Sequence, residues 1–416
     1  MRKLGGTGVL DVLSPDVFSV LQLCSITEPL FPGIKTLDLS PAKESISFIP
    51  LFLSPRTIAI RIWFPPPDFP EVPVASMITN LPSLCPNLQD ICLYGLPEGP
   101  VITTAISTML LATDRNTLRC FCVDYPLSQE AREVVYTLPN LRTLLVVIGR
   151  GTSLPPVILP NLADLTIAYN QDSDWLRAFH GATLGRLEAV TLTSDSENIK
   201  DPLEAFERVA LTASAQHTLS ELNIFTSCSW SPNYHSLHRF TQMKDLAIEF
   251  SCDDGCSSTV DDDVIMNLAR AMPKLETLEL GGPPCRTIVT GVTVKGFMVL
   301  AHHCPNLLIL RVHFQVASLS TLPTISGTTP DVGSVALPGG CALRSLEVGQ
   351  IPIPEESVLV VALTLVHIFP RITSIDCDDE NWDEVVGAIC LSRGIINCSS
   401  KELLSLYLEV TFMTPP

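Results

Sequence analysis

The hydrophobic positions of this chain repeat one short pattern, in which an apolar residue is followed three and five residues later by two more. The clearest copies are Leu275-x-x-Leu278-x-Leu280 and Leu307-x-x-Leu310-x-Val312. The first residue of each copy, here called its anchor, falls at Ile34, Leu88, Leu118, Leu141, Leu162, Leu187, Leu219, Met243, Leu275, Leu307, Leu343 and Ile372. More degenerate copies begin at Thr57 and Leu403. So many copies do not arise by chance in an apolar chain, and they indicate that internal repeats organise the fold.

Many copies follow a short lead that contains proline, such as Cys85-Pro86-Asn87 or Cys304-Pro305-Asn306. Proline has no amide donor and disfavours helix in the residue before it, so each lead is expected to end a helix and turn the chain into a short strand. The stretches between copies predict helices over residues 43–49, 72–81, 101–111, 129–137, 202–215, 261–271, 294–303, 355–368 and 382–391. A helix over residues 11–24 would cover the exposed apolar end of the stack.

The spacing of the anchors sets the fold class. From Ile34 to Leu403, thirteen steps cover 369 residues, which gives a mean period of about 28. Leucine-rich repeats have periods of roughly 20–29 residues. We therefore expect an α/β fold, an irregular leucine-rich repeat solenoid or horseshoe, with a parallel β-sheet on its concave face and helices or loops on its convex face. The Ser, Thr, Pro and Gly residues of 316–341 indicate a surface loop.

Composition narrows the functional classes. The formal net charge of −18 excludes general nucleic-acid binding, because a phosphate backbone needs clusters of lysine and arginine. No apolar run reaches the eighteen residues of a membrane span, so no membrane association is expected. Fourteen cysteines in a chain of this length do not form a disulfide scaffold and are interpreted as small buried hydrophobes. A reducing compartment, cytoplasmic or nuclear, is the corresponding expectation.

The residues that alternate with the apolar pattern should point out of the opposite face of each strand. That concave face is the usual binding surface of a curved solenoid. It is expected to carry the acids Asp38, Asp90, Asp124, Asp164, Glu221, Asp245, Glu249, Glu279, Glu347, Asp376 and Asp378, the bases Arg61 and Arg311, and the aromatic residues Trp63, Tyr94 and Phe225. The excess of acids predicts a groove for a basic protein partner. An equally weighted alternative is that the acids only keep the sheet soluble and prevent self-association.

Motifs for catalysis or metal binding were sought outside this face. Cys252-Asp253-Asp254-Gly255-Cys256 with the acids at 261–263 is the most metal-like cluster, but it lacks the second cysteine pair of a zinc site and the oxygen spacing of a calcium loop. A solvated loop leading into a helix is the preferred interpretation. No phosphate-binding loop, nucleophile elbow or His-Glu-x-x-His motif occurs. We therefore expect no enzyme activity, no metal and no cofactor.

Several segments resemble the repeat region of fungal F-box proteins of the leucine-rich repeat type. They are Leu13-Ser14-Pro15-Asp16-Val17-Phe18, Leu30-Phe31-Pro32, Cys85-Pro86-Asn87-Leu88, Ala301-His302-His303-Cys304-Pro305 and Asp379-Glu380-Asn381-Trp382. Members of that family tether a substrate to a cullin-RING ubiquitin ligase: an N-terminal F-box grips the adaptor subunit, and the repeats hold the substrate. The stretch between Leu13 and Ile34 is shorter than a whole F-box. The F-box itself is therefore expected to be largely missing, in a partial gene product or in a relative that has lost it.

The resemblance implies three segments and a role. Residues 1–30 would form an N-terminal capping helix with the remnant of a linker or F-box, residues 31–410 the solenoid, and residues 411–416 a tail. The implied role is substrate recognition for a ubiquitin ligase, with the adaptor as a partner only if an F-box is present. The alternatives are a free-standing scaffold or competitor that binds a basic protein without delivering it, and an enzyme with its site in the 316–341 loop.

Overall fold

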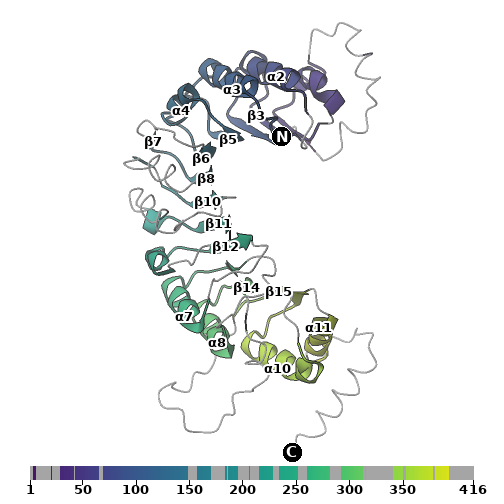
Figure 1. Cartoon of the computed structure of the whole chain (residues 1–416), viewed down its shortest axis with the longest axis vertical. Coiled ribbons are helices and arrows are strands. Elements are labelled where there is room, and N and C mark those ends of the chain that lie inside the picture. Colours follow the sequence, from purple (N-terminus) through teal and green to yellow (C-terminus); the bar gives the residue numbers. More distant parts are fainter. Residues whose placement is uncertain are drawn as a thin grey trace, which may run out of the picture. The chain divides into compact units, whose positions relative to one another are not determined.

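The computed structural model describes residues 3–5, 20, 29–41, 43–64, 69–148, 157–169, 183–184, 186–194, 206, 215–227, 234–251, 260–281, 292–312, 314, 341–349, 353–377 and 380–392. The chain forms two compact units, residues 1–198 with 208–215 and residues 199–207 with 216–416. Each unit is a mixed α/β structure in which parallel strands lie side by side in the order of the sequence (Figure 1).

The sheet of the first unit follows the order β1-β2-β3-β4-β5-β6-β8-β10. Its strands are β1 (Lys3–Gly5), β2 (Thr36–Leu39), β3 (Ala59–Trp63), β4 (Asp90–Tyr94), β5 (Cys120–Pro126), β6 (Thr143–Ile148), β8 (Asp164–Tyr169) and β10 (Ala189–Thr193). The short strands β7 (Ile158–Leu159) and β9 (Thr183–Leu184) pair separately. The connections contain the 3-10 helix η1 (Lys43–Phe52) and the helices α2 (Glu71–Leu84), α3 (Pro100–Ala112) and α4 (Gln129–Val135), and the three α-helices lie side by side along one face of the sheet (Figure 1).

The sheet of the second unit follows the order β11-β12-β13-β14-β15-β16. Its strands are β11 (Glu221–Ser227), β12 (Asp245–Ser251), β13 (Thr277–Leu280), β14 (Ile309–Val312), β15 (Ser345–Gly349) and β16 (Ser374–Cys377). The one-turn 3-10 helix η2 (Ala215–His217) precedes β11. The later connections contain η3 (Tyr234–Arg239), α7 (Asp262–Ala271), α8 (Val294–His303), η4 (Glu355–Ser357) and α10 (Val358–Ile368), and α11 (Glu380–Ser392) follows β16.

Alternate residues of the strands form the core. Strands β2, β6, β8, β13 and β14 alternate between partly exposed and buried residues, so one face of each sheet is covered. Every anchor from Ile34 to Ile372 is buried. Thr57, which replaces an apolar anchor, is also buried, and its hydroxyl donates to the carbonyl of Ile34 at 3.3 Å. That hydrogen bond lets a polar side chain occupy an apolar position.

The proline leads form the same turn in both units. The anchor amide donates to the carbonyl three residues earlier, as from Leu88 to Cys85 (3.2 Å) and from Leu307 to Cys304 (3.1 Å). Proline then sits at the second turn position, where its fixed φ is favourable. The asparagine after it links successive turns, because the side-chain amide of Asn87 donates to the carbonyl of Pro55 at 3.0 Å. The amide of Asn161 donates in the same way to the carbonyl of Pro139 at 2.7 Å.

Most predicted helices that fall on described residues are confirmed, with shifts of a few residues at their ends. The helix predicted over 43–49 is present as the longer 3-10 helix η1. Its buried residues Ile46, Ile49 and Phe52 recur every third position, and that spacing stacks side chains in a helix of three residues per turn. The predicted helices over 11–24 and 202–215, the loop at 316–341 and the copy at Leu403 lie almost entirely outside the described residues.

Asp262 connects two successive helices of the second unit. It lies in the first turn of α7, where Asp261 caps the helix by accepting from the amide of Val264 at 2.8 Å. One carboxylate oxygen of Asp262 accepts from the amides of Thr293 (2.8 Å) and Gly296 (3.1 Å) at the start of α8. The other accepts from the Thr293 hydroxyl at 2.6 Å. A Cβ on Gly296 would lie 2.6 Å from Asp262 Oδ1, so this close approach requires glycine.

Replacing Asp262 with alanine is expected to lower the free energy of unfolding by about 2 kcal/mol, because it removes three hydrogen bonds to a charged acceptor. Urea denaturation followed by circular dichroism would measure the loss. Asp263→Ala, which removes an exposed acid from the same helix turn, is the matched control and should cost much less. Equal losses in the two variants would show that Asp262 contributes only its charge at the helix N-terminus.

Candidate functional site

The face of the first sheet opposite its helices carries several of the residues predicted to bind a partner. Register places Asp38 beside Arg61, whose guanidinium is 3.9 Å from the carboxylate. Trp63 and Tyr94 are also register neighbours, and their rings stack with centroids 4.2 Å apart. Trp63 is 52% exposed despite this stacking. A large aromatic surface is thus presented to solvent beside an ion pair.

The remaining predicted acids of the first unit differ in burial and in the contacts that they make. Asp90 is partly buried, and burial is the main cause of its raised pKa. Asp124 accepts a hydrogen bond from the amide of Gly95 at 2.6 Å, in the turn where Gly95 has a φ of +68°. Its carboxylate thus stabilises a turn of its own chain, which reduces what it can offer a partner. Asp164 is partly buried between Thr143 and Ala189 in the register, so it lies apart from the other acids.

In the second unit the strand face centres on Arg311. Register aligns it between Glu279 on β13 and Glu347 on β15, and Asp376 follows on β16. Its guanidinium lies 3.7 Å from the Glu279 carboxylate and 3.4 Å from that of Glu347. Glu249, two strands away on β12, approaches the same guanidinium at 3.4 Å. We call Glu249, Glu279, Arg311, Glu347 and Asp376 the acidic row.

The acidic row holds four carboxylates and one guanidinium, so it carries a net negative charge. Burial raises the pKa of Glu279, and the nearby Glu249 carboxylate raises it further, although Arg311 acts in the opposite direction. Burial likewise raises the pKa of Glu347; Arg311 lowers it, and Glu279 and Asp376 add repulsion. One guanidinium therefore does not neutralise the carboxylates around it, and the row remains able to attract another cation.

This imbalance predicts a pH-dependent effect of Glu279→Gln. When folding raises the pKa of a carboxyl, that carboxyl stabilises the folded state at pH values below its ordinary pKa of 4.5. This contribution is lost as the pH rises through the pKa of the folded state. At pH 7 the variant should therefore melt roughly 1–3 °C above the unchanged protein, and near pH 4 the difference should vanish. Thermal melts at both pH values measure it. Glu384→Gln, which removes an exposed charge on α11, is the control, and a lower midpoint for Glu279→Gln at pH 7 would contradict the prediction.

The other predicted residues of the second unit border the row. Glu221 pairs in register with Asp245, and its carboxylate accepts from the Asn223 amide at 2.8 Å. Phe225 is partly exposed beside Glu249. These positions extend the acidic surface across β11 and β12. Asp378 lies outside the described residues.

A group of three cysteines on the first sheet was not predicted as a site. Cys92 on β4 and Cys120 and Cys122 on β5 place their sulfur atoms within 4.8 Å of one another. Such cysteines were expected to be buried hydrophobes, and Cys92 and Cys122 are buried. The spacing Cys120-x-Cys122 signals two thiols on one strand face, but only the register shows that Cys92 lies beside them.

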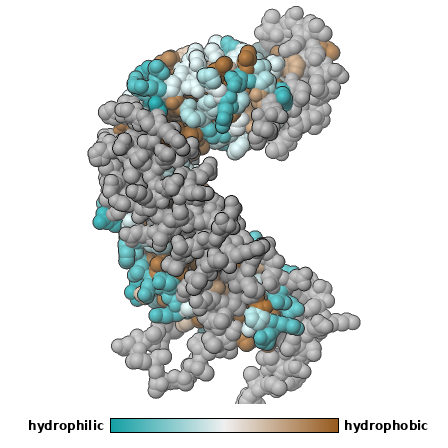
Figure 2. Space-filling view, viewed as in Figure 1, coloured by the Kyte–Doolittle hydropathy of each residue, from teal (hydrophilic) through white to brown (hydrophobic). Residues whose placement is uncertain are grey.

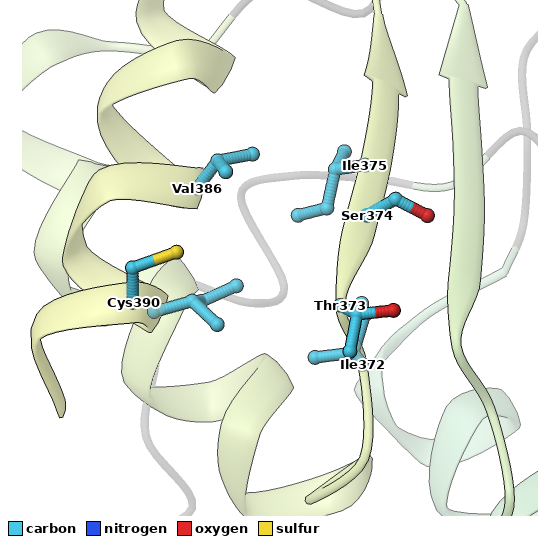
Figure 3. Close-up of a pocket in the computed structure, with 7 residues that line it drawn as sticks. Ile372, Thr373, Ser374, Ile375, Val386 and Cys390 are labelled. Atoms are coloured by element: carbon cyan, nitrogen blue, oxygen red, sulfur yellow. The ribbon is translucent and has the colours of Figure 1, made fainter. Parts of the chain in front are cut away.

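A small pocket of about 80 Å³, partly open to solvent, lies between β16 and α11 (Figure 3). Ile372 and Ile375 point into it from the strand side, and Val386 and Cys390 face them from the helix. The hydroxyl of Ser374 points away from the helix. An apolar lining of this kind suits an aliphatic side chain better than a polar substrate.

The described surface over the helices of the first unit is mostly hydrophilic or neutral, with separate hydrophobic patches (Figure 2). Val72, Val101 and Leu111 are its exposed large apolar residues, and single exposed residues of this kind are common on protein surfaces. Within the described residues, no helix combines the length and apolar character needed to cross a membrane.

Comparison with known proteins adds no family assignment: no family model matches the chain, and the search of curated proteins found no match.

Proposed function

We propose that the chain is a leucine-rich repeat solenoid that acts as a non-enzymatic protein-interaction module. Three observations support the fold. The strands follow the sequence order within each unit, every anchor from Ile34 to Ile372 is buried, and the turn before the anchor recurs with the same hydrogen bond. Stacked units of this kind leave one strand face open, and that face is the usual binding surface of solenoids.

The observation that carries the binding role is the acidic row of the second unit. Three carboxylates share one guanidinium on a partly exposed sheet face, a fourth lies beside them at Asp376, and the pKa values of Glu279 and Glu347 are raised. A lysine or arginine side chain from a partner would relieve repulsion that Arg311 relieves only in part. The partial burial of these carboxylates favours binding of a basic protein segment over a purely solubilising role. Carboxylates that only keep a protein soluble have no need to be half-buried.

The aromatic pair of the first unit supplies a second contact type. Aromatic side chains are enriched among the residues that dominate binding energy at protein interfaces. Trp63 presents a stacked and half-exposed ring beside Arg61 and Asp38, so a partner can bury it without reordering a mobile side chain. This pair fits an apolar or cationic side chain of a protein partner.

Within this role we propose substrate recognition for a cullin-RING ubiquitin ligase, on the strength of the sequence resemblance to F-box proteins. Gel filtration of the purified chain mixed with the ligase adaptor subunit tests whether residues 11–30 hold a minimal F-box. Co-elution would make the chain a working receptor, and separate elution would mean that the repeats act alone, as a free-standing scaffold or competitor that binds the same basic partner. Binding of a labelled basic peptide to the chain alone tests the interaction role independently of the adaptor.

A further inference from the structure

Three thiols converge on the strand face of the first unit. The Cys120 sulfur lies 3.7 Å from that of Cys92 and 3.6 Å from that of Cys122. Two features of the backbone produce this arrangement. Cys92 and Cys122 are register neighbours on adjacent strands, and Cys120 and Cys122 point to the same face because they are two residues apart on one strand. The cluster therefore needs no special loop, and the sheet itself holds it rigid.

Charged and polar groups lie beside the cluster. The Arg61 side chain hydrogen-bonds to the Cys92 sulfur. Arg61 is the register neighbour of Cys92 on β3. Tyr94 lies on the other side, with its hydroxyl close to the thiols of Cys92 and Cys122. The three sulfurs thus have a cation beside them and a polar hydroxyl close to them.

We propose that Cys92, Cys120 and Cys122 bind one Cu(I) ion through three sulfur atoms. Soft thiolate ligands select Cu(I) and zinc among the common metals. Structural zinc sites require four ligands, but among the described residues no further cysteine, histidine or carboxylate joins these three within 4.8 Å. Cu(I) is satisfied by three thiolates in a plane. With metal–sulfur bonds of about 2.3 Å such a plane separates the sulfurs by about 4.0 Å, slightly more than the 3.6 and 3.7 Å of the two sulfur pairs that include Cys120.

Binding at this site involves no electron transfer. Each thiol that is still protonated releases its proton to solvent as its sulfur binds the metal, so affinity should rise with pH. Three thiolates and one Cu(I) carry two net negative charges, and Arg61 compensates part of this charge. Cys120 is itself partly exposed, so a copper donor can reach the cluster from solvent.

Titration of the full chain with Cu(I) alone, under anaerobic conditions and against a chromophoric Cu(I) chelator, tests the site. We expect one tightly held ion per chain, and X-ray absorption should show three sulfur neighbours at about 2.3 Å. Cys120→Ser, the least buried of the three, should weaken binding by about 100-fold or more, since loss of a supporting residue around a metal site already costs about 10–100-fold.

The double variant Cys252→Ser/Cys256→Ser is the matched control and should bind Cu(I) as the unchanged chain does. Circular dichroism of each variant shows whether it is folded, and the absorption measurement on the unchanged chain needs no variant at all. Equal affinity for Cys120→Ser and the unchanged chain would overturn the proposal. Two sulfur neighbours in place of three, or loss of the ion in the control variant, would overturn it as well.

Discussion

Replacing Leu278 with alanine is expected to lower the free energy of unfolding of the second unit by about 2–5 kcal/mol. Leu278 is fully buried on β13 and belongs to a column of leucines in register, with Leu246 on β12 and Leu310 on β14 as its direct neighbours. Both neighbours are fully buried too. Because parallel hydrogen bonds fix the strands on either side, the sheet cannot close around the smaller side chain, and most of the cavity should remain.

Urea denaturation of the full chain, followed by far-ultraviolet circular dichroism, measures this loss. Thr277→Ala is the matched control, because Thr277 lies on the same strand but points to the partly exposed face. We expect it to change the stability by less than about 1 kcal/mol. Similar losses in the two variants would mean that the apolar pattern does not define the buried face of this strand.

The period of the apolar pattern was sufficient to predict which residues form the core. Every anchor from Ile34 to Ile372 is buried because a fixed spacing of apolar residues can only be satisfied by stacking equivalent strands. The bounds of α8, Val294–His303, follow from its capping threonine and from the proline after Cys304. The pattern did not predict Thr57 as a satisfied anchor, since its hydrogen bond to Ile34 depends on how adjacent turns meet.

The binding face was harder to predict from the sequence than the core was. Alternation along a strand identifies which residues point outward, but not which of them meet across strands. Arg311 and Glu249 are 62 positions apart in the chain and come together only through the register of three strands. Asp124 was predicted as a binding residue, yet it bonds to the backbone at Gly95. The cysteine cluster was missed for the same reason, because its three thiols come from two strands.

Neutralising three carboxylates of the acidic row should slow the capture of a basic partner. In the variant Glu249→Gln/Glu279→Gln/Glu347→Gln, Arg311 keeps polar neighbours of the same shape but loses their charge. The row then changes from net negative to near neutral. Clefts with one sign of charge can raise association rates by about 10–10³-fold, so the rate should fall by about tenfold or more at low salt. A short fluorescent peptide of alternating lysine and arginine is the probe, and stopped-flow anisotropy measures its association rate.

The same association rate, measured at increasing ionic strength, distinguishes binding by the strand face from an effect of net charge alone. The control variant Glu356→Gln/Asp383→Asn/Glu384→Gln removes an equal charge from exposed positions on η4 and α11 of the same unit. If the strand face captures basic segments, the control should bind within about twofold of the unchanged chain, with the same steep loss of rate as salt is added. The acidic-row variant should bind slowly and respond weakly to salt. Equal slowing in both variants would show that only net charge matters, and would contradict a binding role for the acidic row.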